Sequence, residues 1–325
     1  MSSTRIEYID RLKGFAILCV IMGHYVFHVL GQSDIIAELI GSFQMPLFFF
    51  LSGYVVSLVP TWKKCGKKVV NFMLPMIWVG IAFAYFSHGT ITDWVKTPFK
   101  YGYWYLYVLS VFYCFLCIMG KVGKGNKSQL LSAGIIFIAI CGLDLITPRK
   151  WNDIFSVWMI KQYWLFFVVG HLIRRHNLIR ILTAKDYVYS ISLIGYVVGF
   201  FLYYNGCSHL FYINAFLFIV FVTSVFLIID DNNSMVLRTL SYFGKNTMDI
   251  YLFHFFLFEM TKLEMVGSWF ADTGNVFIEV LSGILYSVIA AFTSLYIGKI
   301  VHLSSFVNYI IFGSFVKQQK NRIYK

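Results

Sequence analysis

Charged residues are scarce in this chain of 325 residues, because Asp, Glu, Lys and Arg together make up only 13% of it. Soluble domains contain about 25% charged residues, so this chain cannot cover a globular surface with polar side chains. The shortage excludes a soluble or disordered protein and makes nucleic-acid binding a poor explanation of the net charge of +12. Prolines are also few, at five, beside 24 glycines, which leaves no room for a long flexible linker.

Apolar residues are abundant instead: they make up 59% of the chain, aromatic residues make up 20%, and the mean hydropathy is +0.71. A helix that crosses about 30 Å of hydrocarbon needs roughly 20 mostly apolar residues. We therefore predict an all-α, polytopic membrane protein with about ten transmembrane helices, at residues 12–31, 36–59, 69–88, 103–120, 130–146, 154–173, 187–204, 210–229, 247–266 and 276–301. A shorter apolar piece, Phe306 to Phe315, is predicted to lie at the membrane interface.

Lys and Arg residues are concentrated in alternate loops. If the N-terminus is cytoplasmic, 20 of the 27 Lys and Arg residues lie on the cytoplasmic side and four on the other. Short loops rich in Lys and Arg stay in the cytoplasm. We therefore predict a multi-pass protein of the cytoplasmic (inner) membrane with both termini in the cytoplasm. A single membrane domain accounts for residues 1–325, with a short cytoplasmic tail at about 317–325.

The six cysteines fall mostly inside the predicted spans. Cys114 and Cys117 have the spacing of a zinc-binding pair, but no second pair accompanies them, and structural zinc sites need four ligands. We predict no metal site.

The first predicted span contains several ionisable side chains, which are costly in hydrocarbon and are therefore functional candidates. On a helix, Lys13 and His24 are separated by about 20° around the axis and about 16 Å along it, and Asp10 lies on the same stripe. A neutral imidazole at His24 can accept a proton during a reaction. A histidine bonded to a neighbouring helix explains the same pattern. Arg11 points away from the stripe and is predicted to be an interfacial anchor.

Three later spans add polar or unusual residues. Pro46 removes a helical hydrogen bond from the second span, and Gly53 allows another helix to approach closely. His254 lies in the ninth span at a depth similar to that of His24, so the two histidines predict a polar chamber or, alternatively, a haem site. Lys161 is a further ionisable candidate in the sixth span.

Four stretches in this order and spacing carry a family resemblance. They are Asp10-x-x-Lys13 followed by His24, F-Q-M-P-L-F-F-F-L-S-G-Y at residues 43–54, Trp104-Tyr105-Leu106, and G-K-N-T…I-Y-L-F-H ending at His254. Together they resemble the integral-membrane acyltransferase family 3, whose members O-acylate bacterial surface glycans. The resemblance covers almost the entire chain.

The chain departs from the family pattern at two positions. Gln44 stands where many members carry a histidine, and a glutamine cannot take up a proton near neutral pH. Lys13 stands where many relatives have arginine, so a point charge replaces a bidentate fork.

The resemblance implies that an acyl group, usually acetyl, moves from cytoplasmic acyl-CoA to a hydroxyl of a surface polysaccharide or other envelope glycan. His24 would act as a general base or a transient acyl carrier, with Asp10 and Lys13 completing the catalytic set. Substrate contacts are expected from Gln44, Ser52, Trp104, Lys161 and His254. The implied partners are the acyl-CoA donor, with acetyl-CoA as co-substrate and no tightly bound cofactor, a glycan or lipid-linked saccharide acceptor, and membrane lipids.

Basic residues on the cytoplasmic side are candidates for binding the anionic donor. Coenzyme A is heavily charged through its phosphates, which Lys and Arg bind well. The predicted phosphate contacts are Lys67, Lys68, Arg174 and Arg175. For any single one of these residues, the ordinary excess of Lys and Arg in cytoplasmic loops is the simpler explanation.

A second class of function remains open from the sequence. A secondary transporter or flippase would use His24 and His254 as a proton relay inside the membrane.

Overall fold

The computed structural model describes residues 6–30, 34–56, 58–123, 125–179, 187–232, 234–261, 269 and 275–313. Throughout these ranges the regular elements are helices, and no strand occurs among them. The predicted all-α class is therefore confirmed. The predicted cytoplasmic tail at about 317–325 and the end of the predicted span 247–266 lie outside the described residues.

The described part of the chain has seven helical segments that are long and apolar enough to cross a membrane, or eight if one bent pair is counted as a span. The bent pair consists of α8 (Arg149–Phe155) and α9 (Val157–Arg175), which meet at 48°. The seven are Ile35–Tyr54, α4 (Trp62–Phe86), α6 (Trp104–Val122), α7 (Asn126–Ile146), α11 (Tyr187–Tyr204), Ser208–Ile228 and α16 (Val276–Leu303). These seven segments and the bent pair together correspond to eight of the ten predicted spans.

The two other predicted spans are helical but differ in character. Residues 12–31 fall mainly in α1 (Glu7–His28), which carries charged residues in its first turns and histidines at its far end. The first 15 residues of the predicted span 247–266 form α14 (Thr247–Thr261). Polar residues in α1 and the short length of α14 separate them from the strongly apolar helices.

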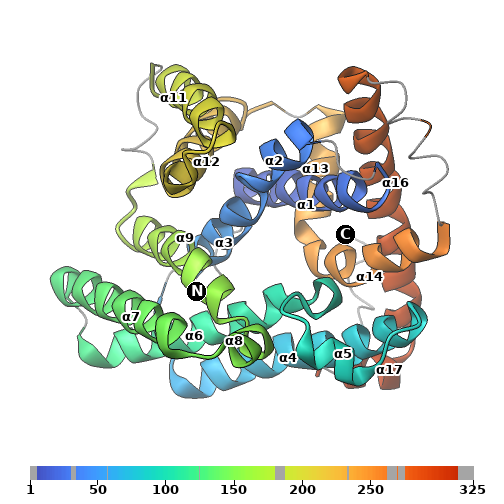
Figure 1. Cartoon of the computed structure of the whole chain (residues 1–325), viewed down its shortest axis with the longest axis horizontal. Coiled ribbons are helices and arrows are strands. Elements are labelled where there is room, and N and C mark those ends of the chain that lie inside the picture. The colour runs from blue at the N-terminus through green and yellow to red at the C-terminus, as the bar shows by residue number, and fades with distance from the viewer. Residues whose placement is uncertain are drawn as a thin grey trace. The chain divides into compact units, whose positions relative to one another are not determined.

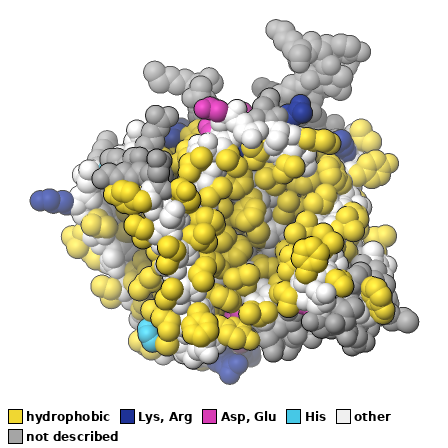
Figure 2. Space-filling model, turned by 90° about the horizontal axis from the view of Figure 1, so that it is seen from above, with side chains coloured by type: hydrophobic (Ala, Val, Ile, Leu, Met, Phe, Trp, Pro, Cys, Tyr) yellow, Lys and Arg dark blue, Asp and Glu magenta, His cyan; other side chains and the backbone are white. Residues whose placement is uncertain are grey.

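Hydrophobic side chains are widely exposed on this molecule. Figure 2 shows a face on which hydrophobic side chains predominate, with charged side chains near its edges. Large exposed apolar side chains lie along α7, α11 and α16. In water such a surface would be unfavourable, whereas lipid chains solvate it, as expected of a multi-pass membrane protein.

The chain divides into two compact units, of which the first comprises residues 1–57 and 166–293. Within it α1 packs against several helices, and α11 lies beside α12 (Figure 1). Its other helices are α2 (Asp34–Gly41), α3 (Gln44–Tyr54), residues 166–175 of α9, α12 (Phe211–Ile228), α13 (Met235–Lys245), α14 and most of α16.

Glycines set two close helix crossings in the first unit. At the α1–α13 crossing, a Cβ on Gly14 would overlap the carbonyl of Leu240, and a Cβ on Gly244 would overlap the carbonyl of Asp10. At the crossing of α3 with α9, a Cβ on Gly53 would overlap the carbonyl of Phe167, and Gly170 faces the carbonyl of Phe50 in the same way. The close approach predicted for Gly53 is therefore confirmed.

Arg11 is buried, with only 3% of its surface exposed. Its guanidinium donates hydrogen bonds to the carbonyl oxygens of Ile229 at 3.3 Å and Asp230 at 2.7 Å, just beyond the end of α12. It also pairs with the carboxylates of Glu7 at 3.3 Å and Asp230 at 3.6 Å. The prediction of an interfacial anchor was wrong, because Arg11 instead supplies donors to carbonyls left open where a helix ends.

Replacing Arg11 with methionine should lower the free energy of unfolding by about 2–4 kcal/mol, because the carbonyls of Ile229 and Asp230 and the carboxylate of Asp230 lose the donor that this buried side chain provides,. Thermal unfolding of the purified protein in detergent measures the effect. The matched control is Arg149→Met in α8, where the arginine is exposed and a change within about 0.5 kcal/mol is expected. Equal stability of the two variants would contradict a capping role for Arg11.

The second unit comprises residues 58–165 and 294–325. It contains α4, α5 (Ile91–Lys96), the 3-10 turn η1 (Lys100–Gly102), α6, α7, α8, the first half of α9, the end of α16, and α17 (Ser305–Phe312). Helix α17 packs against α4, and Gly313 directly after it lies beside Leu74. Residues 306–312 of the apolar piece predicted at the membrane interface thus lie in a separate short helix.

Candidate functional site

Two histidines from helices far apart in the sequence lie together in the first unit. His24 of α1 and His254 of α14 have ring centroids 5.5 Å apart. His254 is completely buried, with 0% of its surface exposed, and His24 is half-buried. The structure therefore brings together the two histidines that the sequence placed at one depth.

The protonation of His254 follows from its hydrogen bond. Its Nδ1 lies 3.0 Å from the carbonyl oxygen of Ile250, one turn earlier in α14. Because a carbonyl oxygen only accepts, Nδ1 carries the hydrogen and Nε2 presents a lone pair. Nε2 is buried and has no hydrogen-bond partner among the described residues. His254 thus offers an unused acceptor next to His24.

Aromatic rings surround the histidine pair. Phe255 lies 4.6 Å from His24 and 4.2 Å from His254, measured between ring centroids. Phe258 lies 6.5 Å and 6.3 Å from the same two rings. His28, one turn beyond His24, is 6.1 Å from it. These rings limit how much water reaches the pair, so a polar group bound there interacts with the imidazoles in low-dielectric surroundings.

Gln44 lies against the same stretch of α1. Its side-chain amide occupies the space beside Gly23, the residue before His24, where a Cβ would overlap the amide oxygen. That oxygen, Oε1, is buried and lacks a hydrogen-bond partner within the described ranges. Gln44 therefore adds a second unused acceptor to the region, consistent with a hydrogen-bonding role and not with acid–base chemistry.

The predicted stripe on α1 lies on one unbroken helix. Asp10, Lys13 and His24 all fall within α1, so the expected rise of about 16 Å from Lys13 to His24 holds. Asp10 is buried beneath α13, with 4% exposed, and Lys13 is half-buried. A path from the start of α1 to His24 therefore follows a single rigid element.

A cluster near the start of α1 escaped the sequence analysis. The Tyr8 and Tyr54 hydroxyls are 2.9 Å apart, and the guanidinium of Arg174 lies over the Tyr54 ring at 5.5 Å from its centroid. Arg174 and Arg175 are half-buried in the last turn of α9. Ser52 donates to the carbonyl of Phe48 in its own helix at 2.8 Å. The cluster fixes Arg174 close to the end of α1 that also carries Asp10 and Lys13.

The remaining predicted site residues belong to the second unit. Trp104 is buried and stacks on Tyr163 at 5.4 Å between ring centroids. Lys161 forms an ion pair with Asp144 of α7. Lys67 and Lys68 are exposed on α4, and the ammonium of Lys68 lies 6.0 Å from the Phe72 ring centroid.

The described residues contain no evident metal-binding site. No group of three or more His, Cys, Asp or Glu side chains there is arranged to hold a metal ion.

The apolar helices long enough to cross a membrane define a multi-pass membrane protein, and its first unit holds a polar site in which His24 and His254 lie together. The chain matches a family model described as an acyltransferase domain over residues 6–299. It therefore belongs to acyltransferase family 3, and the family resemblance predicted from the four motifs is confirmed. No curated protein and no solved structure matches the chain.

Proposed function

We propose that this acyltransferase moves an acetyl group from cytoplasmic acetyl-CoA to a hydroxyl of a surface polysaccharide or other envelope glycan. The observation that carries the proposal is the proximity of half-buried His24 to fully buried His254 in the first unit. The buried Nε2 of His254 has no hydrogen-bond partner among the described residues, which supports a role in accepting a hydrogen bond from a substrate hydroxyl. Membership of the family supplies the acyl-transfer chemistry.

His24 acts as the general base in this proposal. Its imidazole accepts the proton of the acceptor hydroxyl as that oxygen bonds to the thioester carbonyl carbon. The carbon–sulfur bond then breaks, and the imidazolium returns the proton to the sulfur, so that coenzyme A leaves as the thiol. His254 accepts a hydrogen bond from a second hydroxyl of the acceptor through Nε2, and Gln44 holds a further polar group through Oε1.

The donor enters along the stripe of α1 that begins at Asp10 and Lys13. Arg174 and Arg175 lie near that end and supply positive charge for the donor's phosphates. In the second unit, taken by itself, Lys67 and Lys68 are exposed on α4 and remain candidates for binding phosphate. Acetyl-CoA is a co-substrate, and no tightly bound cofactor is required.

The direction of entry depends on topology. The 20-to-4 asymmetry of Lys and Arg supports cytoplasmic termini and insertion in the inner membrane,. In that orientation, α1 runs from the cytoplasm toward the outer face, and His24 lies between the two surfaces.

Inverted membrane vesicles supplied with radiolabelled acetyl-CoA test this function. We expect base-labile radiolabel on the vesicle glycan, and a matching loss of glycan O-acetyl signals by NMR when the gene is deleted. Vesicles from the deletion strain are the control. Proton-coupled movement of a solute without glycan labelling would contradict the proposal and favour a transporter.

A further inference from the structure

A buried carboxylate lies on α16, outside the residues assigned above. Glu279 is 7% exposed, and its Oε2 is buried without a hydrogen-bond partner among the described residues. Its place in the first turn of the helix suits a negative charge, but leaves this oxygen without a donor. A buried carboxyl oxygen without a hydrogen-bond partner is energetically costly in a membrane protein, which makes Glu279 a functional candidate.

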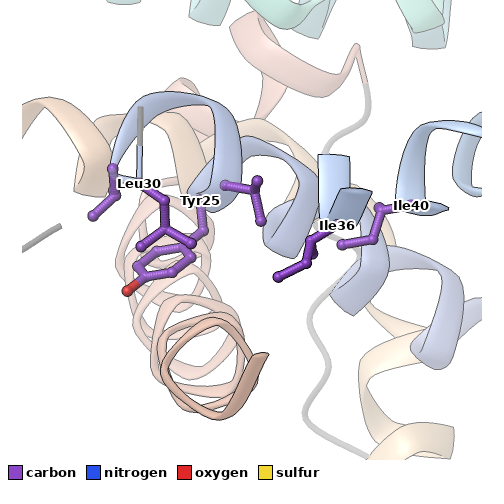
Figure 3. Packing of buried hydrophobic residues seen from close by; sticks show 6 residues of the cluster. Tyr25, Leu30, Ile36 and Ile40 are labelled. Carbon is purple, nitrogen blue, oxygen red and sulfur yellow. The ribbon is translucent and has the colours of Figure 1, made fainter. Parts of the chain in front are cut away.

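Glu279 shares one face of α16 with two further polar residues at helical spacing, Ser282 and Tyr286. The Tyr25 hydroxyl of α1 donates to Ser282 Oγ at 3.0 Å. Gly283 lies on the same face and lets the Tyr25 ring approach closely. Figure 3 shows Tyr25 at the edge of the apolar cluster of α1 and α2, alongside the coils of α16. Polar groups of α1 and α16 therefore face one another at this place.

The polar face of α16 adjoins the histidine pair through two neighbouring aromatic rings, those of Tyr286 and Phe258. Tyr286 lies 5.1 Å from Tyr25 and 4.9 Å from Phe258, measured between ring centroids. Phe258 is the ring that also borders His24 and His28, the latter at 5.9 Å. Only one aromatic side chain therefore separates Tyr286 from the ring of His24.

The side chains of Glu279, Tyr25 and Tyr286 favour a polyhydroxylated ligand. A carboxylate accepts two hydrogen bonds from adjacent hydroxyls, and the tyrosine hydroxyls both donate and accept. Aromatic rings beside them offer apolar faces to the C–H groups of a sugar. A metal ion is disfavoured, because the described residues provide no group of three suitable ligands.

We propose that Glu279, together with the hydroxyls of Tyr25 and Tyr286, binds the saccharide acceptor and directs one of its hydroxyls toward His24. This inference rests on the proposed function and specifies the part of the site that selects the acceptor. Hydrogen bonds to a charged group are strong, so Glu279 provides much of the discrimination between a sugar hydroxyl and water.

The variant Glu279→Gln separates acceptor binding from donor chemistry. In inverted vesicles with radiolabelled acetyl-CoA, two products are measured: label on the glycan, and free acetate formed when water is the acceptor. We expect glycan labelling to fall at least about 10-fold, while acetate release stays within about 2-fold of the wild type. Tyr25→Phe, which keeps the ring, should reduce glycan labelling by a smaller factor. Glu38→Gln, at an exposed carboxylate of α2, is the matched control and should change neither product.

The outcomes distinguish this inference from the function on which it rests. Unchanged glycan labelling by Glu279→Gln would overturn the inference and leave the proposed function standing. An equal fall in both products, with a lowered melting temperature, would assign Glu279 a structural role and would also overturn it. A wild type that releases acetate but labels no glycan would overturn the proposed acceptor and this inference together.

Discussion

Replacing His24 with alanine is expected to reduce acyl transfer by about 10²–10⁴-fold, because the acceptor hydroxyl then has no base within reach. Membrane insertion should be retained, since alanine favours the helix and His24 is only half-buried. Transfer from radiolabelled acetyl-CoA to glycan in vesicles gives the rate. Protein level in the membrane and melting temperature in detergent report folding.

His209→Ala is the matched control, because this histidine is exposed in the turn before α12. It should transfer at the wild-type rate. Wild-type turnover by His24→Ala would refute the assignment of the base. Acid quenching during turnover addresses the other role that the family resemblance implies: acetyl label retained on wild-type protein but not on His24→Ala would make His24 an acyl carrier.

Replacing Gly53 with alanine should lower the free energy of unfolding by about 3 kcal/mol or more, at the upper end for overpacking. The added methyl group overlaps the backbone carbonyl of Phe167, and a helix backbone cannot move aside as a flexible side chain can. Helices α3 and α9 must separate, which also displaces Gly170 from the carbonyl of Phe50. We expect low membrane yield and a clearly reduced melting temperature.

Gly134→Ala in α7 is the control, and its expected effect on the free energy of unfolding has the opposite sign to that of Gly53→Ala. Nothing lies within 4 Å of the position that its Cβ would occupy. Alanine is favoured over glycine in a helix by about 1 kcal/mol, so this variant should be neutral or slightly more stable. If Gly53→Ala were as stable as Gly134→Ala, the close crossing of α3 and α9 would be disproved.

Helix positions were predictable because length and apolar content decide them. The predicted span 187–204 coincides with α11, and the predicted 276–301 differs from α16 by two residues at one end. The predicted span 154–173 includes the end of α8 and most of α9, and the bend between these two helices was not predicted. It falls at Ser156, which has a left-handed φ of 48°, a local conformation that an apolar run does not encode.

The candidate site was predictable only in part. The equal depth of His24 and His254 in their predicted spans led to the prediction that they share a polar chamber. In the structure, the centroids of their rings are 5.5 Å apart. Arg11 was misjudged because a helical wheel gives its direction but not the neighbour it meets, which is the end of α12. Glu279 was missed because a single acid in the first turn of a span resembles an ordinary residue at the membrane surface.

The sequence by itself determined that this chain is helical, apolar enough for a membrane, and a member of acyltransferase family 3, because composition, hydrophobic length and motif order are properties of the chain alone. Only the tertiary structure decided which polar groups meet: His24 with His254, Tyr8 with Tyr54, and Tyr25 with the face of α16 that carries Glu279. The physical reason is that these contacts join helices remote in the sequence. Which helices pack together depends on close contacts between backbone carbonyls and glycines such as Gly14 and Gly53. Such contacts cannot be read from hydropathy.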